Sequence, residues 1–146
     1  GDEPTPNLRA CFVRPRARIE EACWLAERAQ VRAMIDISDG LVGDARHLAA
    51  ASGVGIVLDS RLVPVHPELT SEDAVSLAMS GGEDYELCFA SPPSVVQGRA
   101  EEFEERFGIV LTRVGQVVEG VGVEVGGGGV AGVTGGFDHF SVEGSC

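Results

Sequence analysis

The chain has 146 residues, 44% of them hydrophobic and 23% charged, which is the composition of one globular domain and excludes a disordered chain. Its formal net charge of −12 excludes the basic surface that nucleic acids and anionic membranes require, so we expect neither as a partner. No apolar run reaches membrane-spanning length. The acidic surplus is compatible with a protein that binds divalent cations.

The four cysteines predict neither a zinc site nor a disulfide framework, because none belongs to a C-x-x-C pair or has a histidine close in sequence. Cys23 and Cys88 lie in apolar stretches and are expected to be small core residues. Gly1–Leu8 is polar and rich in proline, without a signal-peptide pattern. We therefore expect a cytoplasmic protein.

Apolar periodicity predicts helices and strands that alternate along the chain. Residues 1–11 are expected to form a flexible arm or linker, and residues 12–146 one domain. This order of elements predicts the α/β class, as an α+β sandwich in which helices cover a mixed β-sheet. The expected helices are 16–29, 40–51, 70–80 and one after Pro93 that ends at 107; the expected strands are 34–36, 55–59, 85–89, 109–114 and 117–125.

The same periodicity assigns an inner face to each expected helix. Gly53 and Gly108 follow the second and fourth helices and are expected to cap them. The predicted inner residues are Ile19, Ala22, Cys23 and Ala26 in the first helix, Leu41, Ala45, Leu48 and Ala49 in the second, Ala74, Leu77 and Ala78 in the third, and Val96, Ala100, Phe103 and Phe107 in the fourth.

The stretch Ile35–Leu41, Ile-Asp-Ile-Ser-Asp-Gly-Leu, indicates a strand that turns directly into a helix. Such a turn is where α/β proteins usually bind ligands, and the carboxylates of Asp36 and Asp39 could hold Mg²⁺ there. In a purely structural interpretation, Asp39 caps the helix and Asp36 makes a surface hydrogen bond. Asp44 and His47, three residues apart, could face a ligand, but the favoured interpretation is a local hydrogen bond at the surface.

A second unusual stretch is Gly81–Leu87, Gly-Gly-Glu-Asp-Tyr-Glu-Leu. Paired glycines allow a backbone to approach a ligand closely, and Glu83 follows them directly. The alternative is an acidic turn that only begins a strand. Near the end of the chain, the aromatic residues of Gly136–Phe140 could fill the core or stack on a ligand ring.

Taken together and in this order, the stretches Ile35–Leu41, Ser80–Leu87 and Gly136–Phe140 closely resemble the C-terminal domain of thiamine-monophosphate kinase. That family is grouped with aminoimidazole ribonucleotide synthetase and selenophosphate synthetase. The resemblance runs from about Phe12 to Phe140, and Arg14-Pro15 and Ser52-Gly-Val-Gly55 also fit the pattern.

The resemblance implies an enzyme that transfers the γ-phosphoryl group of ATP to thiamine phosphate, giving thiamine diphosphate, with several Mg²⁺ ions. It also implies an N-terminal domain, absent from this chain, that supplies most metal ligands, much of the ATP site and the contacts of a homodimer. This chain then provides half of an active site and is expected to be inactive alone.

The resemblance assigns a role to each of five residues. Asp36 and Asp39 match Mg²⁺ ligands, and Ser38 matches an ATP contact. Glu83 and Phe137 match contacts to the thiamine phosphate substrate. No residue is expected to act as a covalent nucleophile or strong base, since the attacking group is an ionised phosphate.

Two other functions remain open at this point. The chain could be a non-catalytic binding or assembly module, a reading favoured by the missing half of the site. It could also belong to a related ATP-dependent enzyme that acts on another small phosphorylated metabolite.

Overall fold

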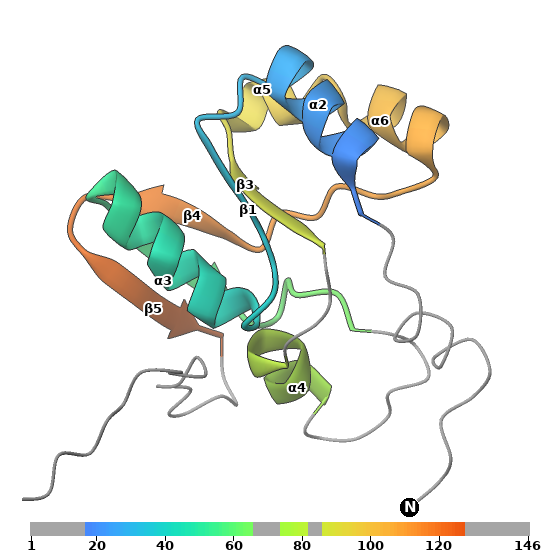
Figure 1. Ribbon diagram of the computed structural model, residues 1–146. Helices are drawn as coiled ribbons and strands as arrows, with labels where there is room; N and C mark the ends of the chain where they lie inside the picture. Colours follow the sequence, from blue (N-terminus) through green and yellow to red (C-terminus); the bar gives the residue numbers. More distant parts are fainter. Residues whose placement is uncertain (1–16, 66–73, 82–85, 128–146) are drawn as a thin grey trace, which may run out of the picture.

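The computed structural model describes residues 17–65, 74–81 and 86–127, in which short helices and strands alternate (Figure 1). No helix in these ranges is both long and apolar enough to cross a bilayer. The helices are α2 (Ile19–Arg28), α3 (Leu41–Ser52), α4 (Ala74–Ser80), α5 (Pro93–Gln97) and α6 (Ala100–Phe107). The strands are β1 (Ala33–Asp36), β2 (Gly55–Asp59), β3 (Leu87–Ala90), β4 (Gly115–Val118) and β5 (Gly122–Gly126).

The strands form two ladders in the described part of the chain. β1 pairs antiparallel with β3, so that Ala33 lies opposite Ala90 and Asp36 opposite Leu87. β2 is the centre of a three-stranded mixed sheet, antiparallel to β4 and parallel to β5, and α3 covers this sheet (Figure 1). The predicted α+β class with helices on a mixed sheet is confirmed.

The two faces of the β1–β3 ladder pack against different hydrophobic clusters. Ala33 and Ile35 of β1 face the cluster that contains α3, whereas Met34 faces a second cluster around Trp24. Cys88 of β3 likewise packs on the α3 side. Successive strand residues point to opposite faces, so a strand covered on both sides needs apolar residues at every position. The run Ala33, Met34 and Ile35 meets this requirement.

The larger cluster joins α3 to both ladders and to α4. The inner face predicted for α3 is confirmed, and helix α3 ends as expected at Gly53, which adopts the left-handed conformation and donates its N–H to the carbonyl of Ala49. The buried residues of this cluster are Leu41, Val42, Ala45, Leu48, Ala49, Ile56, Leu58, Val63 and Met79.

The smaller cluster is an aromatic layer between α2 and α6. Trp24 and Phe103 meet edge to face with ring centroids 5.3 Å apart. The predicted inner stripe of α2 is wrong: Ile19 is 67% exposed and Cys23 is exposed, while Trp24 and Leu25 are buried. The larger apolar areas of the tryptophan and leucine side chains determine which face of the helix is buried.

Four further expectations about the elements are corrected. Leu77 of α4 is 57% exposed, and Met79 takes the buried position instead. The fourth predicted helix is divided into α5 and α6 at Gly98, a residue of low helix propensity. Residues 109–114 form no strand; Ile109, Leu111 and Val114 pack on the two clusters instead, whereas Val110 is 64% exposed. The last predicted strand is two, because a turn with positive φ at Gly120 separates β4 from β5.

Candidate functional site

The turn from β1 to α3 holds the first of the unusual stretches. Asp36 ends β1 and its side chain is exposed, and the following residue, Ile37, donates its N–H to the carbonyl of Glu86 over 2.8 Å. Gly40 precedes the first residue of α3 with φ 85° and ψ 155°, a backbone conformation essentially restricted to glycine. The chain can therefore turn directly from the strand into the helix.

The second unusual stretch lies against this turn. A Cβ atom on Gly40 would lie 2.8 Å from the carbonyl carbon of Ser80, so the two backbones are in direct contact. Ser80 thus lies beside Gly40, and Glu86 lies beside Ile37. Two stretches that are about forty residues apart in sequence meet at one end of the β1–β3 ladder.

Two predicted substrate contacts lie outside the described residues. Glu83 belongs to residues 82–85, and Phe137 belongs to residues 128–146. Their roles stay predictions.

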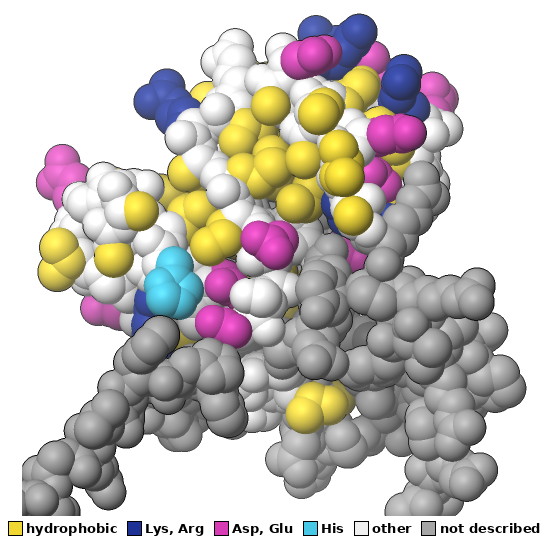
Figure 2. Space-filling view, in the orientation of Figure 1, with side chains coloured by type: hydrophobic (Ala, Val, Ile, Leu, Met, Phe, Trp, Pro, Cys, Tyr) yellow, Lys and Arg dark blue, Asp and Glu magenta, His cyan; other side chains and the backbone are white. Residues whose placement is uncertain are grey.

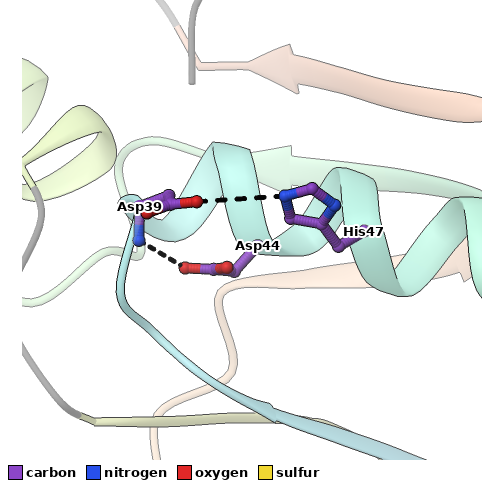
Figure 3. Close-up of side chains that lie close together, drawn as sticks. All are labelled: Asp39, Asp44 and His47. Atoms are coloured by element: carbon purple, nitrogen blue, oxygen red, sulfur yellow. Dashed lines mark hydrogen bonds and ion pairs between the residues drawn. The ribbon is translucent and has the colours of Figure 1, made fainter. Parts of the chain in front are cut away.

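The loop before α3 is held by a carboxylate that the sequence analysis placed on the surface. Asp44 is only 2% exposed, and its Oδ2 accepts hydrogen bonds from the backbone N–H groups of Ser38 at 2.7 Å and Asp39 at 2.9 Å (Figure 3). The interpretation of Asp39 as the cap of this helix is wrong, because Gly40 takes the N-cap position and makes no side-chain hydrogen bond to the helix. The interpretation of Asp44 and His47 as a surface pair is wrong for Asp44.

Asp39, Asp44 and His47 form a group whose ligand-type atoms lie within 4.8 Å of one another. The Nε2 atom of His47 is 4.0 Å from Oδ2 of Asp39, and the His47 side chain is 66% exposed (Figure 3). Within the described ranges this is the one such group, and it does not include Asp36. The structure therefore brings Asp39 together with Asp44 and His47, the two residues that the sequence analysis preferred to interpret as a local surface pair.

Acidic side chains gather beside a histidine near the start of α3, whereas hydrophobic side chains dominate the surface over α2 and β1 (Figure 2). The negative charge of Asp44 also acts on β3: the pKa of the Cys88 thiol is raised, first by burial and then by this carboxylate. A thiol held protonated is a poor nucleophile, so Cys88 has a packing role.

An ion-pair network joins α2 to the second stretch. Arg18 donates from Nη2 to Oε1 of Glu86 at 2.5 Å, and its Nη1 lies 3.5 Å from Oε1 of Glu21, which is 3% exposed. The hydrogen bond to Glu86 is the largest influence on the guanidinium and raises the pKa of Arg18. Arg18 thus joins the start of α2 to Glu86 of the second stretch.

The fold and this turn define an α+β domain with an acidic, ligand-accessible edge where two motifs converge. The chain belongs to the family of the AIR synthase related protein, C-terminal domain, whose model matches residues 6–128. The resemblance drawn from the three stretches is confirmed.

The relatives and solved structures that this chain is similar to include thiamine-monophosphate kinases. The enzyme of Methanopyrus kandleri is 40% identical over 131 residues, which are 86% of this chain and 39% of the relative. The structure from Stenotrophomonas maltophilia K279a aligns with a TM-score of 0.75 at 34% identity, covering 83% of this chain and 39% of that one. AaThiL complexed with AMPPCP and TMP aligns with a TM-score of 0.67 at 36% identity, covering 86% and 40%. The chain thus spans about two fifths of the length of these proteins.

Proposed function

We propose that this chain is the C-terminal domain of a thiamine-phosphate kinase, which transfers the γ-phosphoryl group of ATP to thiamine phosphate and forms thiamine diphosphate. The observation that carries the proposal is the contact of the two unusual stretches, through Gly40 with Ser80 and Ile37 with Glu86. The identity to thiamine-monophosphate kinases supports the choice of reaction.

The residue types of the turn suit this reaction. The attacking oxygen belongs to a phosphate that is already ionised, so the chief obstacle is repulsion between two anionic substrates. Bound Mg²⁺ would offset that repulsion. Asp36 and Asp39 offer hard carboxylate oxygens, which are the donors that fit Mg²⁺. Both side chains are accessible, because Asp36 is exposed and the Asp39 side chain is 30% exposed. Asp36 and Asp39 would each serve a different Mg²⁺ ion, and one carboxylate leaves most of each octahedral shell to water, phosphate oxygens and another domain.

The remaining site residues contact the substrates in this proposal. Ser38, exposed in the turn, contacts ATP, while Glu83 and Phe137 contact thiamine phosphate. A glutamate can pair with the cationic part of thiamine, and an aromatic ring can stack on its flat rings. Support comes from AaThiL complexed with AMPPCP, an ATP analogue, and TMP, which we take to be thiamine monophosphate.

The proposal includes partners for the domain. Residues 1–11 serve as a linker, and residues 12–146 close an active site whose other half is an N-terminal domain. The complete enzyme is a homodimer in the cytoplasm, where ATP and Mg²⁺ are available. The share of the relatives' length that this chain spans leaves room for such a domain.

The test is the formation of thiamine diphosphate by the full-length protein, assayed with ATP and a panel of small phosphorylated acceptors. We expect Mg²⁺-dependent turnover with thiamine phosphate and far less with the other acceptors. Turnover with a different acceptor would identify a related ATP-dependent enzyme instead. If no acceptor is phosphorylated, the alternative of a non-catalytic binding or assembly module is favoured.

A further inference from the structure

One carboxylate oxygen fixes two consecutive residues of the candidate site. Oδ2 of Asp44 accepts from the N–H of Ser38 and from the N–H of Asp39, at 2.7 and 2.9 Å (Figure 3). Hydrogen bonds to an ionised acceptor are stronger than those between neutral groups. A single buried group therefore determines the backbone path at both positions.

The residue that makes these bonds is buried beside the larger hydrophobic cluster. Asp44 belongs to the first turn of α3, and its neighbours Leu41, Val42 and Ala45 are all buried in the larger cluster. Its own N–H donates to the carbonyl of Gly40, which begins the helix. The loop before the helix is thus tied to the core rather than to other surface groups.

The two tied residues direct their side chains differently from Asp44. Ser38 is exposed and the Asp39 side chain is 30% exposed, so both remain accessible to a ligand, whereas Asp44 is 2% exposed. Because Oδ2 of Asp44 already accepts two N–H groups, that oxygen serves the loop rather than a metal ion. The division of roles is between a buried acceptor and accessible ligands.

We propose that Asp44 is a positioning residue, which holds the backbone of Ser38 and Asp39 in place before a ligand binds. The Asp39 carboxylate and the Ser38 hydroxyl can then contact the Mg²⁺–nucleotide ligand without a further cost of ordering the loop. The inference rests on the proposed function for the identity of that ligand. The constraint on the loop itself depends only on the hydrogen bonds of Asp44. Preorganised ligands bind more tightly because less conformational freedom is lost on binding.

The test compares Asp44→Ala and Asp44→Asn with the parent in the full-length protein. The alanine variant removes the acceptor, whereas the asparagine variant retains a neutral oxygen that can take the place of Oδ2. The first readout is hydrogen exchange of a peptide covering 36–41, measured by mass spectrometry. We expect exchange there to be about tenfold faster in Asp44→Asn and faster still in Asp44→Ala, because charge-assisted hydrogen bonds are weakened or lost.

The second readout is the binding of Mn²⁺, a probe for the Mg²⁺ site, in the presence of AMPPCP. The concentration of free Mn²⁺ is measured by electron paramagnetic resonance. We expect Asp44→Ala to weaken binding about tenfold and Asp44→Asn to restore part of it, as for residues that orient metal ligands. The concentration of Mg²⁺ needed for half-maximal turnover is expected to rise from the parent to Asp44→Asn and further to Asp44→Ala.

The control is Glu102→Gln, in α6. Glu102 accepts hydrogen bonds from Arg28 and Arg99, and α6 packs on the other face of the β1–β3 ladder. This variant is expected to change neither readout. Unchanged exchange at 36–41 in both Asp44 variants, or equal Mn²⁺ binding in Asp44→Ala and the parent, would overturn the inference. Because exchange does not depend on turnover, it tests the positioning role even if the proposed reaction is wrong.

Discussion

The two faces of the β1–β3 ladder are used for different purposes. On one side, Trp24 and Phe103 form an aromatic layer whose charged groups, such as the Arg28–Glu102 pair, lie at the surface. On the other side, α3 places a buried carboxylate, Asp44, beneath a turn with accessible polar side chains. The first face contributes packing, and the second combines packing with a polar site.

The difference teaches how a short ladder can support a precise site. Apolar residues at successive positions of β1 let two clusters hold the same strand, so its end at Asp36 has a fixed place. Backbone hydrogen bonds to Asp44 then fix the next residues. Substitutions on the two faces should therefore separate stability from activity.

The largest effect is expected from Phe103→Ala on the aromatic face. Phe103 is 2% exposed and contacts Trp24, so truncation should lower the free energy of unfolding by about 3–5 kcal/mol. Urea denaturation of the full-length protein measures this change. Val121→Ala, at a side chain 89% exposed, is the matched control and should have almost no effect. A small loss in Phe103→Ala would mean that the aromatic layer does not stabilise the domain.

The next effect is expected on the other face, from Asp39→Asn. Loss of a metal-binding carboxylate should lower kcat/KM for thiamine phosphate by at least about 100-fold, while the unfolding midpoint changes little. Steady-state kinetics at several Mg²⁺ concentrations provide the measurement. Near-normal turnover in this variant would remove Asp39 from the set of metal ligands.

A smaller effect is expected from Gly40→Ala, where the two stretches touch. The added Cβ would lie 2.8 Å from the backbone of Ser80, and the alanine would have to adopt a φ of 85°. We therefore expect a loss of about 2 kcal/mol in the free energy of unfolding, together with lower activity. Gly53→Ala is the matched control at the other end of α3. Its φ is also positive, but nothing lies within 4 Å, so we expect about 1 kcal/mol and full activity. Equal activities in the two variants would argue against the contact with Ser80 being important for function.

The smallest effect concerns an exposed ion pair that belongs to neither face. Hydrogen bonds from the Arg61 guanidinium, and then from its backbone N–H, lower the pKa of Asp59 from 3.8 to about 2. A lowered pKa in the folded state stabilises the protein above pH 3.8, and this contribution is lost as the pH falls towards 2. The melting temperature of Asp59→Asn should thus be slightly below that of the parent at neutral pH, and the difference should vanish in acid. A difference independent of pH would exclude the ion pair as its cause.

Much of the fold follows from the sequence where apolar spacing is regular. The buried face of α3 follows the regular spacing of Leu41, Ala45 and Leu48. The helix ends at Gly53 for a local reason, since this glycine adopts the left-handed conformation. In α2, by contrast, small residues suggested one stripe, but the large side chain of Trp24 determined the buried face. The predicted strand 109–114 does not form, and its residues Ile109, Leu111 and Val114 instead pack partly buried on clusters built from residues distant in sequence.

The candidate site could be predicted only in part. The stretch that contains Asp36 and Asp39 was recognisable from its sequence pattern. Its contact with the second stretch agrees with the prediction that both belong to one site. The role of Asp44 could not be read from the sequence, because its partners are backbone N–H groups that any residue possesses. Only the folded chain shows that this carboxylate turns back towards the loop before its own helix.

The most direct test of the central claim is a structure of the full-length protein with Mg²⁺, AMPPCP and thiamine phosphate. We predict a carboxylate oxygen of Asp39 at about 2.1 Å from a Mg²⁺ ion that also binds phosphate oxygens. We also predict that Asp44 retains its hydrogen bonds to the Ser38 and Asp39 backbone. A complex in which the substrates are bound but Asp39 still faces His47, with no metal in contact, would contradict the account.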